Sequence, residues 1–201
     1  KAPLGNSVHE LRTFECGLPF QINAMTVHPF SISHDAADPV GFIIGQNGRR
    51  IGVATDLGFV TPQLTAHLQD CHLLILEANH DPEMLMNGPY PWPLKKRIQS
   101  RCGHLSNQQS KHLLQELHHR HLQHVILAHL SETNNRPELA LAAARSALEG
   151  QNLCAPQLLV GSQNEPVVWD SNCMEEVCGA CTMLIQGKPR QACSTLVDQL
   201  E

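Results

Sequence analysis

The chain has 201 residues, a formal net charge of −5 at pH 7, 42% hydrophobic residues and 16% charged residues. This composition supports a buried core and excludes a wholly disordered chain, and the negative charge excludes a basic surface over the whole molecule. No apolar run approaches the roughly 20 residues of a membrane-spanning helix, so we expect no membrane span. The histidines all precede residue 130, whereas half of the eight cysteines lie between Cys173 and Cys193. This separation predicts two sites with different chemistry.

The two ends of the chain carry signals of their own. The sequence begins at Lys1 without a methionine or a secretion signal, and it stops at Glu201 inside an amphipathic stretch. We therefore expect both ends to be cut and the protein to be cytoplasmic, or held near a membrane through a partner complex. In that compartment we expect the cysteines to be thiols or metal ligands rather than disulfides.

The chain up to residue 81 alternates apolar runs with turn signals. We expect strands at 24–33, 40–46, 50–55 and 72–77. Asn47-Gly48 lies between two apolar runs and predicts a β-hairpin. Thr61 as the N-cap and Pro62 as the first helical residue predict a helix between the third and fourth strands.

The chain from residue 82 to residue 161 continues this alternation. We expect one helix at 94–101, a second that begins after the capping box of Ser106 and Gln109, and a third at 137–148. We expect strands at 124–128 and 157–161. Alternating strands and helices predict an α/β layered fold. After Pro166 the sequence changes to short segments rich in cysteine and glycine. We therefore place a domain boundary near Glu165, between domains 1–165 and 166–201.

Three acid or imidazole side chains directly follow expected strands. His34, Asp56 and His129 each stand at the carboxyl end of a strand, where layered α/β enzymes keep their chemistry. Imidazole and carboxylate are ligands of zinc and manganese, and one carboxylate can bridge two ions. The pattern therefore indicates a metal site. The alternative is that these side chains cap loops and helices.

Six phrases of the sequence carry a family resemblance. They are His34-Asp-Ala-Ala-Asp-Pro-Val-Gly-Phe, Ala54-Thr-Asp-Leu-Gly, Asn79-His-Asp, Gly88-Pro-Tyr-Pro-Trp, Gly103-His-Leu-Ser-Asn and His129-Leu-Ser. On these phrases, residues 24–161 resemble the C-terminal part of a metallo-β-lactamase-fold hydrolase of the YycJ-type exonuclease-like subgroup and, more distantly, ribonuclease Z. The resemblance implies the C-terminal part of an αββα sandwich.

The resemblance also implies roles for individual residues. His34 would bind a first ion, Asp56 would bridge two ions and His129 would bind the second, with zinc or manganese as the metal. His104 aligns with a histidine of ribonuclease Z that helps to protonate the leaving group. The implied reaction is metal-assisted hydrolysis of a nucleic acid or another phosphodiester.

The sequence departs from this family at one motif. The metal-binding loop His-x-His-x-Asp-His, which the family carries upstream of these residues, is absent, and only His9 and His28 precede His34. Three ligands leave both ions without a full protein shell. We therefore predict that the chain as it stands is not an active hydrolase.

Two further groups of histidines and acids need an interpretation. His119-x-His121-x-x-His124 reproduces the histidine spacing of the absent loop, but it lies at a helix end before a strand and lacks the aspartate. We expect a solvated helix end there, with a weak metal site as the alternative. His80 and Asp81 follow the strand at 72–77. They are candidates for supporting the metal ligands or facing the substrate, with loop capping as an equal alternative.

Four basic residues gather on one expected helix. Lys95, Lys96, Arg97 and Arg101 have the charge to grip a nucleic-acid backbone. Basic residues on a helix also occur simply because that face is solvated. We favour the solvated face and keep the backbone grip as the alternative.

The C-terminal cysteines have a specific spacing. Cys173, Cys178 and Cys181 form C-x4-C-x2-C, and Cys193 follows after eleven more residues, which is the plant-type arrangement for a 2Fe–2S cluster. Between the third and fourth cysteines we expect a hairpin that turns at residues 186–187. A zinc site and an unliganded set are the alternatives to the cluster.

The residues around these cysteines carry a second resemblance. Pro166-Val-Val-Trp-Asp, Cys173-Met-Glu-Glu-Val-Cys-Gly-Ala-Cys-Thr-Met and Gly187-Lys-Pro-Arg-Gln-Ala-Cys are similar to the iron–sulfur subunit of succinate dehydrogenase or fumarate reductase. The resemblance implies a partial β-grasp segment of the ferredoxin type that receives electrons from a flavoprotein subunit. Each resemblance covers only part of a family domain, so we expect a natural fusion or, as the favoured interpretation, an artificial join.

Three functions remain open from the sequence. The first is a truncated metal-dependent hydrolase, the second is an electron-transfer module that binds 2Fe–2S, and the third is a fragment with neither cofactor. The length of the matching region favours the hydrolase fold, whereas the cysteine set is the more complete site. Our leading hypothesis is a truncated hydrolase joined to a 2Fe–2S segment, with the electron-transfer protein as the alternative.

Overall fold

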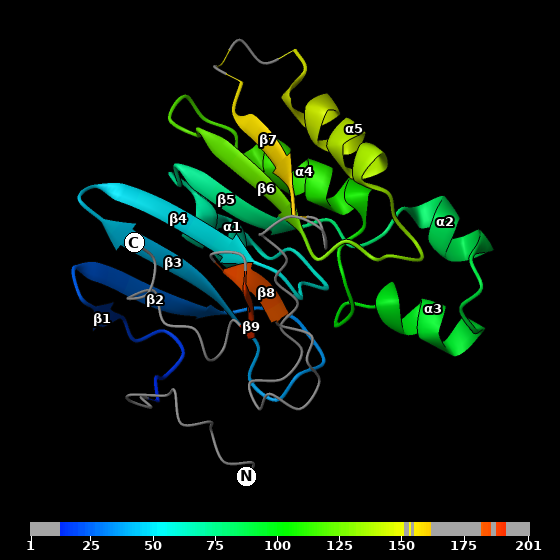
Figure 1. Ribbon diagram of the computed structural model, residues 1–201, viewed down its shortest axis with the longest axis horizontal. Helices are drawn as coiled ribbons and strands as arrows, with labels where there is room; N and C mark the ends of the chain where they lie inside the picture. Colours follow the sequence, from blue (N-terminus) through cyan, green and yellow to red (C-terminus); the bar gives the residue numbers. More distant parts are fainter. Residues whose placement is uncertain (1–12, 151–152, 154, 162–181, 186–187, 192–201) are drawn as a thin grey trace.

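The computed structural model describes residues 13–150, 153, 155–161, 182–185 and 188–191. Its main body is a seven-stranded mixed sheet whose strands lie in chain order (Figure 1). They are β1 (Phe20–Ile22), β2 (Met25–Ser31), β3 (Val40–Gln46), β4 (Arg49–Ala54), β5 (Leu73–Glu77), β6 (His124–Ala128) and β7 (Gln157–Val160). The strands from β1 to β4 pair antiparallel, and those from β4 to β7 pair parallel.

Helices connect the parallel strands, as parallel pairing requires. In the described part of the chain they are α1 (Pro62–Leu68), α2 (Pro82–Asn87), α3 (Trp92–Ile98), α4 (Asn107–Leu117) and α5 (Pro137–Leu148). Figure 1 shows α1 and α4 behind the sheet, whereas α2 and α3 stand to one side of it. None of these helices combines the length and the apolar character needed to cross a membrane.

Local sequence signals explain where several elements begin. Asn47 and Gly48 adopt φ values of 49° and 75°, as a two-residue hairpin turn requires, and join β3 to β4. At the start of α1, the side chain of Thr61 accepts a backbone N–H of the first turn at 3.1 Å. At the start of α4, the capping box of Ser106 and Gln109 is complete. These three sequence predictions are confirmed.

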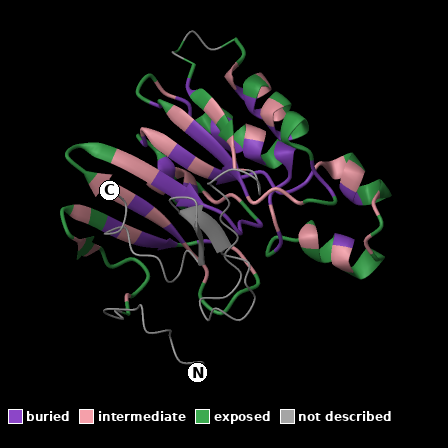
Figure 2. Ribbon diagram, in the orientation of Figure 1, coloured by how far each residue is buried: buried purple, intermediate pink, exposed green. Residues whose placement is uncertain are grey.

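The core lies between the helices and one face of the sheet. Alternate residues of the central strands, Leu74 and Leu76 in β5 and Val125 and Leu127 in β6, are almost completely buried. The helix side chains of the same cluster are Leu64, Leu68, Leu113, Leu114, Leu117, Ala140, Ala144 and Ala147. Figure 2 shows how buried residues concentrate in the central strands. Because each buried leucine contributes about 1.5–3 kcal/mol, this cluster holds α1, α4 and α5 on the sheet.

The predicted α/β class is confirmed, and some bounds differ from the prediction. The helix expected at 94–101 is α3 and begins at Trp92, while α2 was not expected at all. The main body is one mixed sheet with its helices, which corresponds to one half of a two-sheet sandwich. The complete αββα arrangement stays a prediction.

A separate two-stranded sheet follows in the cysteine-rich part of the sequence. Strands β8 (Thr182–Ile185) and β9 (Lys188–Gln191) pair antiparallel, so the predicted hairpin is confirmed in its strands. The residues of its turn lie outside the described residues. The boundary near Glu165 and the partial β-grasp arrangement likewise stay predictions.

Candidate metal centre at the carboxyl edge of the sheet

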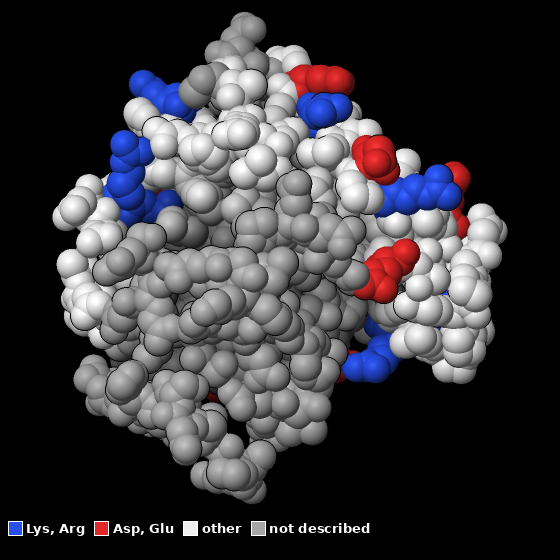
Figure 3. All heavy atoms as spheres, in the orientation of Figure 1, with Lys and Arg blue, Asp and Glu red and all other residues white. Residues whose placement is uncertain are grey.

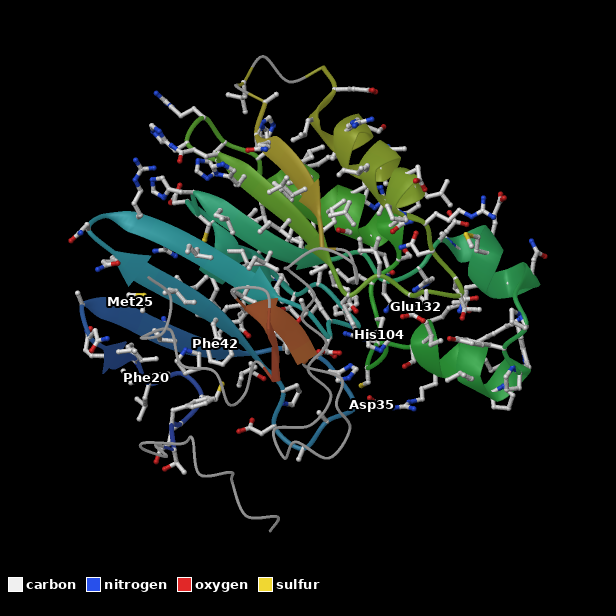
Figure 4. The ribbon with its side chains drawn as sticks, viewed as in Figure 1. Phe20, Met25, Asp35, Phe42, His104 and Glu132 are labelled. Carbon is white, nitrogen blue, oxygen red and sulfur yellow. The ribbon has the colours of Figure 1, made fainter. Side chains whose placement is uncertain are left out.

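The sheet topology brings four polar side chains to one edge. Strand β2 runs parallel to β4, because both pair antiparallel with β3. The carboxyl ends of β2, β4, β5 and β6 therefore share an edge. His34 follows β2, Asp56 follows β4, Glu77 ends β5 and His129 follows β6. A fifth side chain, His104, reaches this edge from the loop between α3 and α4 (Figure 4).

Asp56 lies among three imidazoles. Its Oδ1 atom is 3.8 Å from His34 Nε2, 3.5 Å from His129 Nδ1 and 4.0 Å from His104 Nδ1. The same oxygen is buried and accepts no hydrogen bond from the described residues. Asp56 is buried, and this burial raises the pKa of its carboxyl above the usual value. An unsatisfied buried carboxylate oxygen is costly, and a cation held by Asp56 and the imidazoles would satisfy it, so these residues fit a metal ion.

His34 is oriented by the backbone before α4. Its Nδ1 atom donates to the carbonyl oxygen of Gly103 at 3.1 Å, which directs Nε2 toward Asp56. Metal-binding imidazoles are commonly fixed in this way by a carbonyl on the other ring nitrogen. A side chain at Gly103 would collide with the carbonyl oxygens of Ile98 and Arg97, at 2.2 and 2.3 Å from the added carbon. Glycine is therefore required where the loop supports His34.

Glu77 is the centre of a second set of contacts. It is fully buried, and its Oε1 atom accepts hydrogen bonds at 2.7 Å from Nδ1 of both His104 and His129. Its Oε2 atom accepts the N–H of Leu57 at 2.6 Å. Burial by itself raises the pKa of Glu77, but the hydrogen bonds from His104 and His129 outweigh it and lower the pKa to about 2. The group is therefore a carboxylate that orients two imidazoles.

Glu77 is not among the site residues predicted from the sequence. Its signal is an acidic residue that ends the apolar strand β5, at the same edge of the sheet as the Asp56 that follows β4. An ionisable side chain in this position lies at the edge where the other candidates meet. The same reasoning that selected Asp56 therefore applies to Glu77.

The backbone is strained at two of these positions. Asp56 and His129 adopt φ values of 54° and 58°, in the left-handed region that non-glycine residues rarely occupy. Such conformations cost about 1–3 kcal/mol and are retained where the surrounding structure enforces them, often at functional sites. Here the N–H of Leu57 binds Glu77 and the N–H of Gly58 binds the carbonyl of Ser33, at 2.6 and 2.7 Å. These bonds hold the turn that presents Asp56.

Two groups of side chains in the described part of the chain lie close enough to hold a metal ion. One contains His34, Asp56 and His104, and the other contains Glu77, His104 and His129. In the second group both imidazoles already hydrogen-bond to the carboxylate of Glu77. We therefore interpret Glu77 as an orienting residue rather than a ligand. The edge of the sheet thus provides imidazole and carboxylate groups for metal binding.

The structure separates the two residues that follow β5. Asp81 Oδ1 accepts the N–H groups of Glu83 and Met84 at 3.0 and 2.9 Å, so Asp81 caps α2 and is not part of the centre. His80 is buried, and its Nδ1 atom has no hydrogen-bond partner among the described residues. Burial lowers the pKa of His80 to about 4, so its imidazole is neutral at pH 7. His80 is close enough to Glu77 for the carboxylate to influence this pKa.

His119, His121 and His124, which reproduce the histidine spacing of the absent loop, lie in neither candidate metal group, and His119 contacts the backbone. His119 donates from Nε2 to the carbonyl of Cys71 at 3.0 Å, and its Nδ1 atom accepts the N–H of His121 at 3.3 Å. Both ring nitrogens of His119 are therefore engaged by the protein. His119, His121 and His124 are in neither of the two groups above.

The basic residues around α3 have distinct environments. Lys95 is buried, and its ammonium donates to the carbonyl oxygens of Met86 and Gly88 at 2.7 and 2.8 Å. Both sequence interpretations of Lys95, a nucleic-acid grip and a solvated face, are wrong, because this side chain ties α3 to the end of α2. Lys96 and Arg97 are exposed.

The four C-terminal cysteines lie outside the described residues. The proposed cluster ligands Cys173, Cys178, Cys181 and Cys193 are therefore not placed by the structure. Of the remaining cysteines, Cys71 is buried, whereas Cys16 and Cys102 are exposed and unbonded. The prediction of the cluster therefore rests on the spacing of the cysteines in the sequence.

Two family models match the chain. The model of the β-lactamase superfamily domain matches residues 3–130, and the model of the 2Fe–2S iron–sulfur cluster binding domain matches residues 107–201. The matches overlap at 107–130, which contains all of α4 and all of β6. Because β6 pairs with β5 and β7 in the main sheet, we assign the overlap to the β-lactamase-type fold.

Known proteins show the same two similarities. Exodeoxyribonuclease YycJ of Bacillus anthracis is 34% identical over 143 residues, covering 71% of this chain and 51% of that protein. The succinate dehydrogenase iron–sulfur subunit of Bacillus subtilis is 61% identical over 46 residues, covering 23% of this chain and 18% of that protein. The chain therefore spans about half the length of the exodeoxyribonuclease and a small part of the iron–sulfur subunit.

A solved structure shares the fold of the sheet and its helices. The metallo-β-lactamase-fold protein YhfI of Bacillus subtilis superposes with a TM-score of 0.53 at 12% identity, covering 73% of this chain and 51% of that one. At this identity the likeness shows the fold alone. The mixed sheet, the polar groups at its carboxyl edge and the family match lead to one conclusion. The chain belongs to the β-lactamase superfamily and continues into a 2Fe–2S domain that resembles the succinate dehydrogenase iron–sulfur subunit.

Proposed function

We propose that the described sheet carries the metal-binding half of a phosphodiester hydrolase that acts on DNA. The observation that supports this proposal is the buried Asp56 Oδ1 atom, which lacks a hydrogen-bond donor and lies within 4.0 Å of three imidazoles. The similarity to exodeoxyribonuclease YycJ favours DNA as the substrate. Zinc and manganese are the ions that suit this ligand set.

The proposed roles follow from the contacts of each side chain. Asp56, His34 and His129 would hold the metal ions. When bound, divalent ions would lower the pKa of a water molecule and polarise the phosphodiester. His104 has Nδ1 committed to Glu77, so its Nε2 atom is the one that can donate a proton to the departing oxygen. Glu77 thereby fixes the orientation of the His104 ring.

We further propose that these 201 residues alone bind the ions weakly and do not hydrolyse DNA. The sequence contains no His-x-His-x-Asp-His motif, so no other cluster of this kind supplements the three ligands. A metal ion with an incomplete protein shell is held with low affinity, because each ligand contributes to the binding free energy. The site is therefore expected to fill only at high concentrations of the metal.

Manganese binding to the full chain tests this proposal. Titration with Mn²⁺ into the millimolar range, followed by electron paramagnetic resonance of the free ion, is expected to show weak saturable binding. Asp56→Asn is expected to abolish it. Asp70→Asn is the matched control, because Asp70 also has a positive φ but lies on the surface away from the centre. Equal binding by the two variants would refute the metal site, and rapid DNA hydrolysis by the chain alone would refute the predicted inactivity.

The second candidate function is electron transfer through a 2Fe–2S cluster. It is supported by the match of residues 107–201 to the cluster-binding model and by the C-x4-C-x2-C spacing. We propose Cys173, Cys178, Cys181 and Cys193 as the ligands and a flavoprotein subunit as the electron donor. Anaerobic reconstitution of the full chain should give a reddish-brown, reducible species that Cys178→Ser lacks and Cys16→Ser retains. A colourless wild-type product would exclude this function.

A further inference from the structure

A cavity separates the candidate metal centre from α3. It has a volume of about 500 Å³ and is lined by His34, His104 and His129 on one side and by Tyr90, Leu94 and Arg97 on the other. Pockets of about 300–1,000 Å³ take small ligands. The space therefore suits one end of a single strand rather than the full width of a duplex. Figure 4 shows Asp35, His104 and Glu132 around this region, between the strand ends and α3.

Arg97 is held at the mouth of this cavity by Asp35. Its guanidinium donates from Nε to Asp35 Oδ2, and 65% of its side chain remains exposed. The other carboxylate oxygen, Asp35 Oδ1, lies 3.4 Å from His34 Nε2. Asp35 thus sets the position of Arg97 relative to the centre. No other described group accepts a hydrogen bond from this guanidinium, so its terminal N–H groups can donate to phosphate oxygens.

The charge of the cavity makes Arg97 important for an anionic ligand. Asp35 and Glu132 both line the cavity, and both repel phosphate. Arg97 neutralises Asp35, and this ion pair holds the pKa of the Asp35 carboxyl below its usual value. Figure 3 shows the basic side chains of the displayed face scattered rather than gathered in one patch. Attraction of a nucleic acid must therefore be local.

Two exposed aromatic rings lie next to cations that belong to α3 or closely follow it. The guanidinium carbon of Arg101 lies 4.1 Å from the ring centroid of Phe59, and Nζ of Lys96 lies 5.5 Å from that of Trp92. Trp92 is 52% exposed and Phe59 is 36% exposed. Aromatic faces combined with cations are typical of surfaces that bind single-stranded nucleic acid, where bases stack and phosphates are paired.

We propose that this face binds a single-stranded DNA end, with Arg97 holding a phosphate beside the metal centre and Phe59 and Trp92 stacking on bases. Asp35 is the positioning residue, and a phosphate replaces it as the partner of Arg97 when DNA binds. The inference rests on the proposed hydrolase function, because it names the form of DNA that the same site takes. It also predicts that replacing Arg97 weakens DNA binding, whereas replacing Asp35 strengthens it.

The test measures DNA binding by the full chain without metal. Fluorescence anisotropy in EDTA compares a fluorescein-labelled single strand with the blunt duplex of the same sequence. We expect the single strand to bind several-fold more tightly. Arg97→Met is expected to weaken single-strand binding about tenfold. The slope of log affinity against log salt concentration should also become shallower, by the amount that corresponds to about one phosphate contact. The matched control Arg145→Met, on the exposed side of α5, should stay within about twofold of wild type.

The variant Asp35→Asn distinguishes an Arg97 that binds phosphate from an Arg97 whose ion pair only stabilises the structure. If Asp35 competes with phosphate for Arg97, Asp35→Asn tightens single-strand binding, whereas a structural role predicts weaker binding for both variants. Trp92→Ala is expected to weaken binding of the single strand more than binding of the duplex. Equal affinities of Arg97→Met and Arg145→Met, or a duplex bound as tightly as the single strand, would overturn the inference. Because metal is absent, DNA binding that depends on Arg97 can persist even if the Mn²⁺ titration fails, so the two failures are distinguishable.

Discussion

Glu77 shows how one buried carboxylate organises a site from beneath. A single oxygen accepts hydrogen bonds from two imidazoles that come from different parts of the chain, 27 and 52 residues away. Hydrogen bonds to a charged group are worth more than neutral ones, about 1.5–3 kcal/mol each. Glu77 therefore contributes to the stability of the fold as well as to the orientation of His104 and His129.

Replacing Glu77 with glutamine is expected to lower the free energy of unfolding by about 3 kcal/mol. The amide cannot accept two N–H groups with the strength of a carboxylate, and its own N–H₂ group has no described acceptor at this position. Urea denaturation of the full chain measures the change. Glu116→Gln, at an exposed position of α4, is the control and should change stability by less than about 0.5 kcal/mol. Similar values for the two variants would contradict the orienting role.

His80 gives the fold an expected sensitivity to acid. Burial lowers its pKa from 6.5 to about 4, so the unfolded chain binds the proton more tightly than the folded one. The stabilising contribution is complete above about pH 6.5 and is lost as the pH falls toward 4, by about 3 kcal/mol in total. Unfolding free energies measured between pH 7 and 4 should fall less steeply for His80→Gln than for wild type. The exposed His112→Gln should follow wild type, and a parallel fall in all three proteins would contradict this assignment.

Much of the candidate site was predictable at the level of residues. His34, Asp56 and His129 were selected because the carboxyl ends of parallel strands meet at one edge, and the structure brings them together there. Their roles as ligands stay predictions. Lys95 was misinterpreted, because charge in a sequence does not reveal whether a side chain is buried against backbone carbonyls.

At the scale of elements, α2 and α3 form one unit next to the cavity. The first helix was missed although Asp81 and Pro82 repeat the N-cap and first-turn proline that identified α1 at Thr61 and Pro62. The start of α3 was placed too late because its N-cap residue, Pro91, has no capping side chain to signal it. Capping chemistry thus predicts helix starts where a polar side chain provides the cap.

Lys95→Met is expected to destabilise the α2–α3 unit. The variant keeps the aliphatic length but removes the ammonium, which leaves the carbonyl oxygens of Met86 and Gly88 without their donor, at a cost of about 2 kcal/mol. Hydrogen exchange of the α2–α3 amides and urea denaturation measure the effect. Lys96→Met is a closely matched control, since Lys96 is the adjacent and exposed lysine. Equal exchange rates in the two variants would show that Lys95 does not hold α3 against the end of α2.

At the scale of the whole molecule, the α/β layering was the most predictable feature. Alternating strand and helix patterns indicate crossover connections, and these place β4 to β7 side by side. The opposite face of the sheet carries half-buried apolar residues, Phe42, Ile44, Ile51, Leu73 and Ile75. A sheet that is apolar on both faces is typical of layered folds with material on each side. The sequence patterns alone did not show that one face would be covered by described helices and the other would not.

The main sheet is expected to fold independently of the cysteine segment. All of its strand pairings join residues between Phe20 and Val160. Cys178→Ser should therefore remove the visible absorption of a reconstituted cluster and leave the urea midpoint, followed by far-ultraviolet circular dichroism, unchanged. A midpoint lowered in step with the loss of the cluster would show that the two parts fold together.

The location of a bound ion decides whether the carboxyl edge of the sheet is a metal site. Crystals of the full chain soaked in millimolar manganese can be measured at a wavelength where manganese scatters anomalously. We expect a partly occupied peak beside Asp56 Oδ1, between His34 and His129, which disappears in Asp56→Asn. A peak only at His119, His121 and His124, or none beside Asp56 in the wild-type protein, would refute the metal site at this edge.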